Sequence, residues 1–293
     1  MSILFSFPKN MNLAKKIAFN LLIPLGEMPL RQFPDGESYV RLLSDVHGKQ
    51  VIIVCSLDAP NQKIAELLFF ASVAKELGAQ SVGIVAPYLG YMRQDKRFTS
   101  GEAVTSKIFA EIISQYFDWL ITVDPHLHRY EFLNEIYSIP CTVVHTVDLI
   151  RQWIHDTVKD PLIIGPDKES EQWAFAVAKK LEAPSIALKK IRRGDRDVDI
   201  SVPNVDQYLE YTPVLVDDII STGRTMIETL KKLYDVGFRT SVCVGIHGLF
   251  VDSAYEELLN AGVTQVATTN TVLHKTNTID VSLLLASEIK KYL

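Results

Sequence analysis

Short apolar runs alternate with longer helical patterns along most of this 293-residue chain, and this alternation constrains the fold more than any other feature. Runs such as VIIVCS (51–56) and WLITVD (119–124) have the length of strands, whereas QKIAELLFFASVAKELG (62–78) has the length of a helix. Strands this apolar are usually buried on both faces, as in parallel sheets covered by helices. The pattern therefore predicts an α/β protein in which each largely parallel sheet is flanked by helices.

The same rhythm runs through both halves of the chain and predicts two domains. A length of 293 residues suits two domains of ordinary size or one large domain. We place the boundary just after the strand CTVVH (141–145), so that the domains span 1–147 and 148–293. No Gly/Ser-rich linker marks the join, so we expect the two domains to pack closely. The last helix, VSLLLASEIKKYL (281–293), could belong to the second domain or pack back on the first.

Composition argues against several classes of function. The net charge is −5 and the pI about 5.8, which gives no basic surface for nucleic acid or an anionic membrane. The most apolar stretch, IAELLFFASVA (64–74), is too short to span a bilayer, and the N-terminus lacks the pattern of a signal peptide. The 3 cysteines, Cys55, Cys141 and Cys243, match no disulfide framework or zinc spacing, which favours a reducing cytoplasm.

The segment PVLVDDIISTGRTM (213–226) carries the strongest chemical signal. Two carboxylates at the end of a buried strand can accept hydrogen bonds from the hydroxyls of a polyol. The turn STGRT (221–225) then offers hydroxyls and backbone N–H groups at a helix N-terminus, which suits a phosphate, and Gly223 lets the backbone approach it closely. Asp218 or Ser221 alone would more often cap the next helix, but the unit as a whole favours a sugar phosphate site.

Polar groups also follow other predicted strands, at the edge where parallel sheets bind ligands. After the strand SVGIVAPY, Arg93 and Arg97 could bind a polyphosphate, although a solvated basic loop would have the same composition. His126 and His128 follow WLITVD beside Asp124, where a metal or phosphate role and an ordinary structural role are about equally supported. These strand ends are therefore candidates for a polyphosphate or metal site.

Three further segments carry charge near predicted strand ends. Asp167 ends the strand IIGPD, and its carboxylate could hold Mg²⁺ directly or through water. The segment LKKIRRGDRDVDI (188–200) could fold over phosphates and supply cations, or it could be a solvated hairpin connection. The segment RQFPDGESYVRL (31–42) contains a Pro-Asp-Gly turn, which is common between strands and says little alone.

Together these segments resemble the ribose-phosphate pyrophosphokinase family, also called phosphoribosyl-pyrophosphate (PRPP) synthetases. VDDIISTGRT is similar to the PRPP motif of type I phosphoribosyltransferases, and FPDGE, PYLGYMRQDKR, TVDPHLHR, GPD and KKIRRGDRDV occur in the family's order and spacing. Any one motif is weak, but six in order, from Arg31 to the C-terminal helix, are specific. The resemblance implies two tandem type I phosphoribosyltransferase-like domains. It also implies Mg²⁺-dependent transfer of the β,γ-diphosphoryl group of ATP to the anomeric hydroxyl of ribose 5-phosphate, giving PRPP and AMP for nucleotide biosynthesis.

The resemblance also implies roles for single positions. It assigns ATP binding to Phe33, Asp35, Gly36, Glu37, Arg93 and Gln94. It assigns Mg²⁺ to His126 and Asp167, and the catalytic loop pair that meets the reacting phosphates to Lys190 and Arg192. It assigns ribose 5-phosphate to Arg192, Asp217, Asp218, Ser221, Thr222, Gly223, Arg224 and Thr225. In this family the ATP site is completed across a subunit interface. The resemblance therefore implies ATP and subunit contacts in the first domain, the sugar phosphate in the second, and a homo-oligomer that is a dimer or a dimer-based assembly.

The sequence departs from the common family pattern at three places. Ser221 stands where many bacterial and animal members have a third acid, and Arg224 stands where a small residue is common. KESEQ (168–172) replaces the glycine-rich turn that often follows GPD. Together with TVDPHLHR, these departures make the sequence resemble the archaeal-like branch of the family more closely. They leave open the regulation by ADP or phosphate, the subunit number and the way in which pyrophosphate is held.

Three alternative functions stay open at this point. A phosphoribosyltransferase that uses PRPP would keep VDDIISTGRT but would not need FPDGE or MRQDKR. A non-catalytic regulatory relative usually loses loop or metal residues, whereas Lys190, Arg192, His126 and Asp167 are all present. A synthetase that acts on a different sugar phosphate is compatible with Arg224 and KESEQ.

Overall fold

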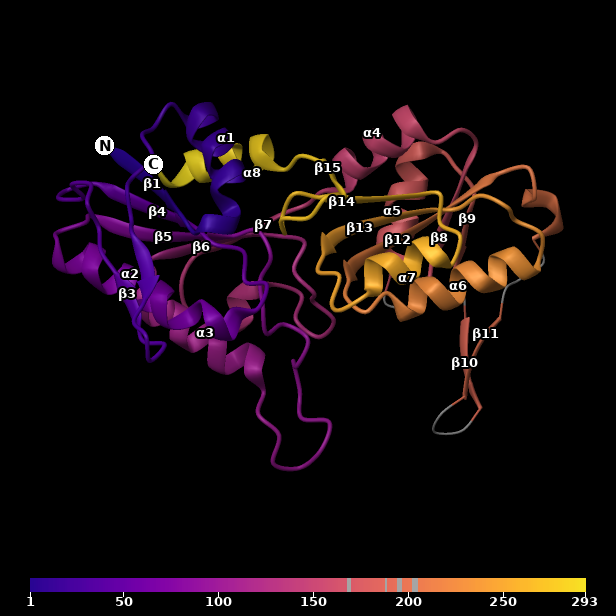
Figure 1. Ribbon diagram of the computed structural model, residues 1–293, viewed down its shortest axis with the longest axis horizontal. Coiled ribbons are helices and arrows are strands. Elements are labelled where there is room, and N and C mark those ends of the chain that lie inside the picture. The colour runs from indigo at the N-terminus through magenta and orange to yellow at the C-terminus, as the bar shows by residue number, and fades with distance from the viewer. Residues whose placement is uncertain (168–169, 188, 194–196, 202–204) are drawn as a thin grey trace. The chain divides into compact units, whose positions relative to one another are not determined.

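Two parallel β-sheets, each flanked by helices, form the framework of the chain (Figure 1). The computed structural model describes the chain except residues 168–169, 188, 194–196 and 202–204, and the side chains of 187–204 are also outside the description. One compact unit contains Met1–Val144 and Val281–Leu293, and the other contains His145–Asp280. The predicted α/β architecture with two parallel sheets is confirmed.

The first unit contains a five-stranded parallel sheet in the order β1-β4-β5-β6-β7. Its strands are β1 (Ser2–Ser6), β4 (Gln50–Val54), β5 (Ser81–Ala86), β6 (Trp119–Val123) and β7 (Cys141–Val144). Helices α1 (Met11–Leu21) and α8 (Ser282–Ile289) pack together on one face, and α2 (Ile64–Glu76) and α3 (Thr105–Tyr116) cover the other (Figure 1). A separate antiparallel hairpin is formed by β2 (Leu30–Gln32) and β3 (Ser38–Val40).

The second unit contains a sheet of six described strands in the order β15-β14-β13-β12-β8-β9, all parallel. They are β8 (Pro161–Gly165), β9 (Ser185–Ala187), β12 (Thr212–Ile220), β13 (Val242–Gly248), β14 (Gln265–Thr269) and β15 (Asn277–Ile279). The helices are α4 (Val147–Thr157), α5 (Glu171–Leu181), α6 (Arg224–Asp235) and α7 (Ala254–Asn260). Strands β10 (Lys189–Arg193) and β11 (Asp197–Ser201) form a separate antiparallel hairpin.

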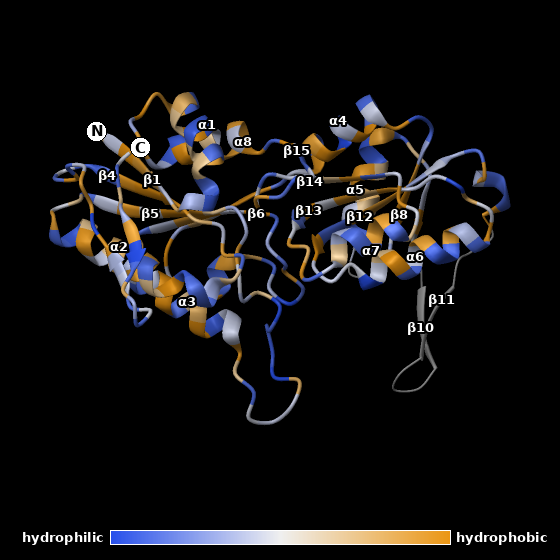
Figure 2. Cartoon of the chain, in the orientation of Figure 1, coloured by the Kyte–Doolittle hydropathy of each residue, from blue (hydrophilic) through white to orange (hydrophobic). Residues whose placement is uncertain are grey.

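The sequence explains why the sheets are buried. The residues of β6 are all buried, and in β4 and β5 only the first residue is partly exposed, because helices cover both faces of the sheet. Figure 2 shows this as hydrophobic colour along β4 and β5. Helix α6 instead buries one face, with Met226, Ile227, Leu230 and Leu233 at helical spacing. Burial of apolar side chains is therefore continuous in the strands and one-sided in this helix.

Short 3-10 helices complete the secondary structure at Pro8–Asn10, Pro60–Gln62, Leu133–Glu135, Asp206–Tyr208 and Lys290–Tyr292. Within the described ranges, none of the helices has both the length and the apolar character needed to cross a membrane.

Candidate active site

The strand order of the second sheet marks a place for a ligand beside β8. Strand β9 lies on one side of β8 and β12 lies on the other, so the direction of chain progression reverses at β8. Helix α5, which follows β8, packs with α4, whereas α6, which follows β12, packs with α7 (Figure 1). In open α/β sheets, ligands bind beyond the carboxyl ends of the strands where such a reversal occurs. Asp167, which follows β8, and Asp217 and Asp218, near the end of β12, lie at this edge.

Strand β12 is longer than the sequence predicted. It pairs with β8 as far as Leu215, but its pairing with β13 continues to Ile220. The expectation that the strand ends on Asp217 and Asp218 was wrong, because the apolar residues that follow them still find a partner on β13. The two aspartates therefore lie on a strand that is paired on its β13 side, and this pairing fixes their backbone.

The carboxyl groups at this edge interact electrostatically. Asp218 is buried, with 8% of its surface exposed, and its backbone N–H donates a hydrogen bond of 3.0 Å to Asp217 Oδ1. Removal from water raises the pKa of the Asp217 carboxyl well above its ordinary value of 3.8, and the negative charges of Asp218 and Asp167 raise it further. A cluster of like charges is relieved by a bound cation or by hydrogen-bond donors such as hydroxyls.

Asp167 is held by reciprocal hydrogen bonds with Ser170. The Asp167 N–H donates to Ser170 Oγ, and the Ser170 N–H donates to Asp167 Oδ1, each over 3.0 Å. The Ser170 hydroxyl also donates to the Asp167 carbonyl oxygen at 3.0 Å. Ser170 is fully buried directly before α5, so the pattern fixes the Asp167 carboxylate at the start of that helix. Lys168 and Glu169, from the KESEQ departure, lie outside the described residues.

The turn after β12 leads into the N-terminus of α6. Gly223 directly precedes the helix with a φ of 67°, a conformation that glycine adopts without strain. The Val251 N–H donates to the Ser221 carbonyl oxygen over 3.0 Å and so fixes the start of the turn. The first N–H groups of a helix have no intrahelical acceptor, so with the helix dipole they suit an anion. Ser221 and Thr225 are half-buried, whereas Thr222 and Arg224 are exposed.

Lys190 and Arg192 lie on β10 of the β10–β11 hairpin. The antiparallel register places Lys190 opposite Ile200 and Arg192 opposite Val198. The backbone is thus a hairpin, which is compatible both with a segment that folds over phosphates and with a solvated connection. The side chains of both residues lie outside the described part of the structure.

Phe33, Asp35, Gly36 and Glu37 share one tight turn between β2 and β3. The Phe33 N–H donates to the Glu37 carbonyl oxygen over 2.8 Å, and the Gly36 N–H donates to the Phe33 carbonyl oxygen over 2.9 Å. Gly36 has a φ of 92°, which glycine alone tolerates readily. All four residues are exposed, and Phe33 keeps 40% of its surface accessible. The turn therefore presents an aromatic ring and two carboxylates together.

Asp95, which follows Arg93 and Gln94 in the loop after β5, contacts the loop after β6. The Asp95 side chain is only 7% exposed, and its Oδ2 lies 3.6 Å from Arg129 Nη1. The Tyr130 hydroxyl donates to the Asp95 carbonyl oxygen over 3.1 Å. Arg93 is exposed and Gln94 is half-buried. Because β5 and β6 are neighbours in the sheet, these contacts bring the predicted ATP loop beside the loop that carries His126.

His126 contacts the second histidine of its motif. The Nε2 atoms of His126 and His128 lie 2.6 Å apart, so one ring nitrogen must accept while the other donates. Asp124, just before them, is buried with a φ of 31°, a strained backbone of the kind found at functional sites. In the ranges that the structure describes, no group of three or more His, Cys, Asp and Glu residues could hold a metal ion. His126 belongs to the first unit and Asp167 to the second.

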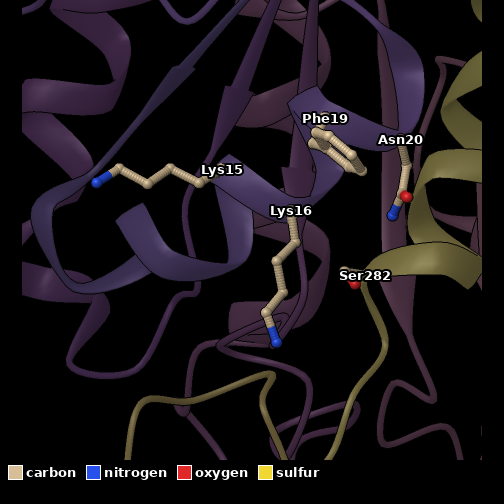
Figure 3. Close-up of a pocket in the computed structure, with 5 residues that line it drawn as sticks. All are labelled: Lys15, Lys16, Phe19, Asn20 and Ser282. Atoms are coloured by element: carbon tan, nitrogen blue, oxygen red, sulfur yellow. The ribbon is translucent and has the colours of Figure 1, made fainter.

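Two surface cavities lie away from these residues. In the first unit, a cavity of about 360 Å³ is lined by Lys15, Lys16, Phe19, Asn20 and Ser282, and Figure 3 shows Lys15 directed away from the Lys16 side chain. In the second unit, a cavity of about 270 Å³ is lined in part by His155, Leu181 and Tyr211. Neither cavity contains a predicted site residue.

Sequence reasoning missed three side chains that support predicted positions. Arg31 lies against the Phe33 ring, Asp95 joins two loops, and Ser170 holds Asp167. Strand alternation around the Pro-Asp-Gly turn could have paired Arg31 with Phe33 on one face. A serine three residues after an aspartate is a known signal for reciprocal side-chain and backbone hydrogen bonds. Asp95 had no such signal, because its partners come from the next loop.

Comparison with known proteins identifies relatives over most of the chain. The profile of the N-terminal domain of ribose phosphate pyrophosphokinase matches residues 2–116, and that of the phosphoribosyl transferase domain matches 134–285. The ribose-phosphate pyrophosphokinase of Sulfurisphaera tokodaii is 32% identical over 286 residues, which is 95% of each chain. That of Saccharolobus solfataricus is 34% identical over 256 residues, 86% of this chain and 87% of the relative. The crystal structure of phosphoribosylpyrophosphate synthetase from Mycobacterium smegmatis has the same fold, with a TM-score of 0.88 at 24% identity over 100% of this chain and 99% of that one.

Proposed function

Because the chain belongs to the ribose-phosphate pyrophosphokinase family, we propose that it transfers the β,γ-diphosphoryl group of ATP to the anomeric hydroxyl of ribose 5-phosphate. The products are PRPP and AMP, as for a ribose-phosphate diphosphokinase, and PRPP would serve nucleotide biosynthesis. The observation that carries the proposal is the pair Asp217 and Asp218 on β12, a few residues before the Gly223 turn at the N-terminus of α6. This arrangement offers acceptors for a diol and N–H donors for a phosphate within one short segment.

The sugar phosphate is proposed to bind along this segment. The carboxylates of Asp217 and Asp218 accept hydrogen bonds from ribose hydroxyls, which would relieve the electrostatic repulsion at Asp217. The 5-phosphate lies in the turn 221–225, where the backbone and the hydroxyls of Ser221, Thr222 and Thr225 donate to its oxygens. Arg224 is exposed at the start of α6 and supplies positive charge near that phosphate.

ATP is proposed to bind in the first unit. The base and ribose contact Phe33, Asp35, Gly36 and Glu37 in the β2–β3 turn, and Arg93 and Gln94 contact the rest of the nucleotide. Two observations support this assignment: the turn exposes an aromatic ring suited to stacking, and an arginine follows β5 on a loop tethered through Asp95.

Phosphoryl transfer depends mainly on positioning and on the neutralisation of charge. Lys190 and Arg192 are proposed to meet the reacting phosphates, with Lys190 stabilising charge that develops on the transferred group. The residues present fit Mg²⁺, because it takes one or two protein carboxylates together with substrate phosphates and water, and the carboxylate cluster is rich in oxygen ligands. By the family resemblance, His126 in the first unit and Asp167 in the second are each proposed as a position that holds Mg²⁺. When bound, the ion neutralises phosphate charge.

Assembly and location are part of the proposal. The family resemblance favours a homo-oligomer, a dimer or a dimer-based assembly, in which the ATP site is completed by a second subunit. We assign ATP and subunit contacts to the domain 1–147 and ribose 5-phosphate to the domain 148–293. Cys55, Cys141 and Cys243 are free thiols, in keeping with work in the cytoplasm.

Phosphorus NMR of the purified protein with Mg-ATP and ribose 5-phosphate tests the function directly. PRPP and AMP appearing together, without ADP, would support diphosphoryl transfer. Binding of both substrates without reaction would contradict it and favour a regulatory relative or another acceptor sugar. In that case, PRPP with nucleobases would test the phosphoribosyltransferase alternative.

A further inference from the structure

Arg31 contacts two aromatic rings of the β2–β3 hairpin. It lies on β2 directly opposite Tyr39 on β3 and two residues before Phe33. Its guanidinium carbon lies 4.7 Å from the centre of the Phe33 ring and 4.2 Å from the centre of the Tyr39 ring. The two rings meet edge to face, with centres 6.1 Å apart and planes at 85°. Strand alternation explains why these three side chains share one face of the hairpin.

These contacts pack the Arg31 guanidinium and the Tyr39 ring against the Phe33 ring. Both distances are within the 6 Å range in which a cation is attracted to a ring face. Phe33 still has 40% of its surface exposed, so the ring remains accessible to a partner. The hairpin is also anchored to the body of the first unit, because the Ser38 hydroxyl donates to Glu66 Oε1 on α2 over 3.1 Å. The Phe33 ring is therefore an exposed aromatic surface on a supported hairpin.

We propose that Arg31 is a positioning residue that holds the Phe33 ring as a stacking platform for the purine base of the nucleotide substrate. This inference rests on the proposed function, since it needs ATP to be the nucleotide. A flat base stacks on an aromatic ring at low entropic cost when the ring is already fixed. Arg31 acts through Phe33, so its loss weakens binding of the base while leaving the contacts to the phosphates in place.

The test compares a ligand that has a base with one that has none. Equilibrium binding of Mg-ATP and of inorganic tripolyphosphate is measured by calorimetry on the full-length protein and its variants. Arg31→Met removes the guanidinium but keeps a long apolar side chain, and Arg31→Lys keeps the charge without the planar group. Arg41→Met is the matched control, because it removes one exposed arginine just after β3 and changes the net charge equally.

We expect Arg31→Met to raise the Kd for ATP about threefold to tenfold, as for the loss of cation–π contacts at an exposed site. The Kd for tripolyphosphate should change less than twofold, Arg31→Lys should recover part of the loss, and Arg41→Met should match the wild type. An equal loss for both ligands, or no loss for ATP, would overturn the inference.

The inference and the proposed function fail in different measurements. PRPP formation by the wild-type protein is followed separately by phosphorus NMR. If no PRPP forms but ATP binds, the transfer reaction is wrong, and the ratio of Kd values still decides the role of Arg31. If the wild-type protein binds tripolyphosphate but does not bind ATP more tightly, the stacking platform is wrong.

Discussion

Replacing Asp217 with asparagine should stabilise the ligand-free protein at neutral pH. The substitution keeps the shape of the side chain but removes a negative charge from beside Asp218 and Asp167. At an effective dielectric constant of about 20–50, two like charges about 6 Å apart repel by roughly 1–3 kcal/mol. We therefore expect Asp217→Asn to raise the free energy of unfolding by about 1–3 kcal/mol and Tm by about 3–10 °C.

The gain in the free energy of unfolding from Asp217→Asn should increase as the pH rises. Burial and neighbouring charge raise the folded-state pKa of Asp217 above its ordinary value of 3.8. A raised pKa means that the carboxyl contributes favourably below its unfolded-state pKa, and that this contribution is lost as pH rises through the folded-state value. Asparagine does not titrate, so the difference in stability between variant and wild type should grow from pH 4 toward neutral pH.

Scanning calorimetry of the ligand-free protein from about pH 4 to pH 8 would measure this difference. Glu210→Gln is the matched control, since Glu210 is exposed in the same unit and the substitution changes net charge equally. The same Asp217→Asn protein should bind ribose 5-phosphate more weakly than the wild type. An Asp217→Asn protein that is no more stable than the wild type at pH 7, or a gain that is constant with pH, would refute the reasoning.

Three further predictions concern other parts of the chain. Gly83→Ala should lower the free energy of unfolding by about 1–3 kcal/mol through overpacking, because a Cβ there would lie 1.9 Å from the Trp119 ring. The change should appear as a lower Tm, and an unchanged Tm would contradict the prediction. Arg129→Met removes the ion pair with Asp95, so it should raise the KM for ATP about twofold to fivefold and leave the KM for ribose 5-phosphate unchanged. Equal changes in the two KM values would argue against a local effect. Lys190→Ala should lower kcat by about 10²–10³ in steady-state assays of PRPP formation; near-normal turnover would exclude the assigned role.

The sequence was sufficient to predict the architecture because burial leaves a local pattern. The apolar residues of β5 and β6 are continuous in the chain, so their burial on both faces could be read directly. The predicted α/β fold is confirmed by the two parallel sheets, and the family, which was predicted from six motifs in order, is confirmed by the matches to known proteins. The short strand β15 (Asn277–Ile279) was missed, because it has one buried residue and joins the sheet through backbone pairing. The extension of β12 to Ile220 was missed because it depends on its partner β13.

The candidate site was predictable in position but not in its interactions. Asp167 could be placed just after a strand, where the carboxyl edge of a parallel sheet gathers side chains, whereas Asp217 lies three residues before the end of β12. Their mutual electrostatic effect depends on β8 lying next to β12, and the chain does not reveal that order. The contact of Arg31 with Tyr39 is likewise a pairing across strands. The roles assigned to the individual site residues remain predictions.

The serine at position 221 has an electrostatic consequence for the site. A carboxylate at this position would be attracted to the N-terminus of α6, and it would add negative charge next to a strand that already carries Asp217 and Asp218. Ser221 has a neutral hydroxyl, so it neither occupies the positive end of α6 with a charge nor adds negative charge beside the two aspartates. The positive end of α6 therefore stays available to an anion, in keeping with the 5-phosphate site proposed for the turn 221–225.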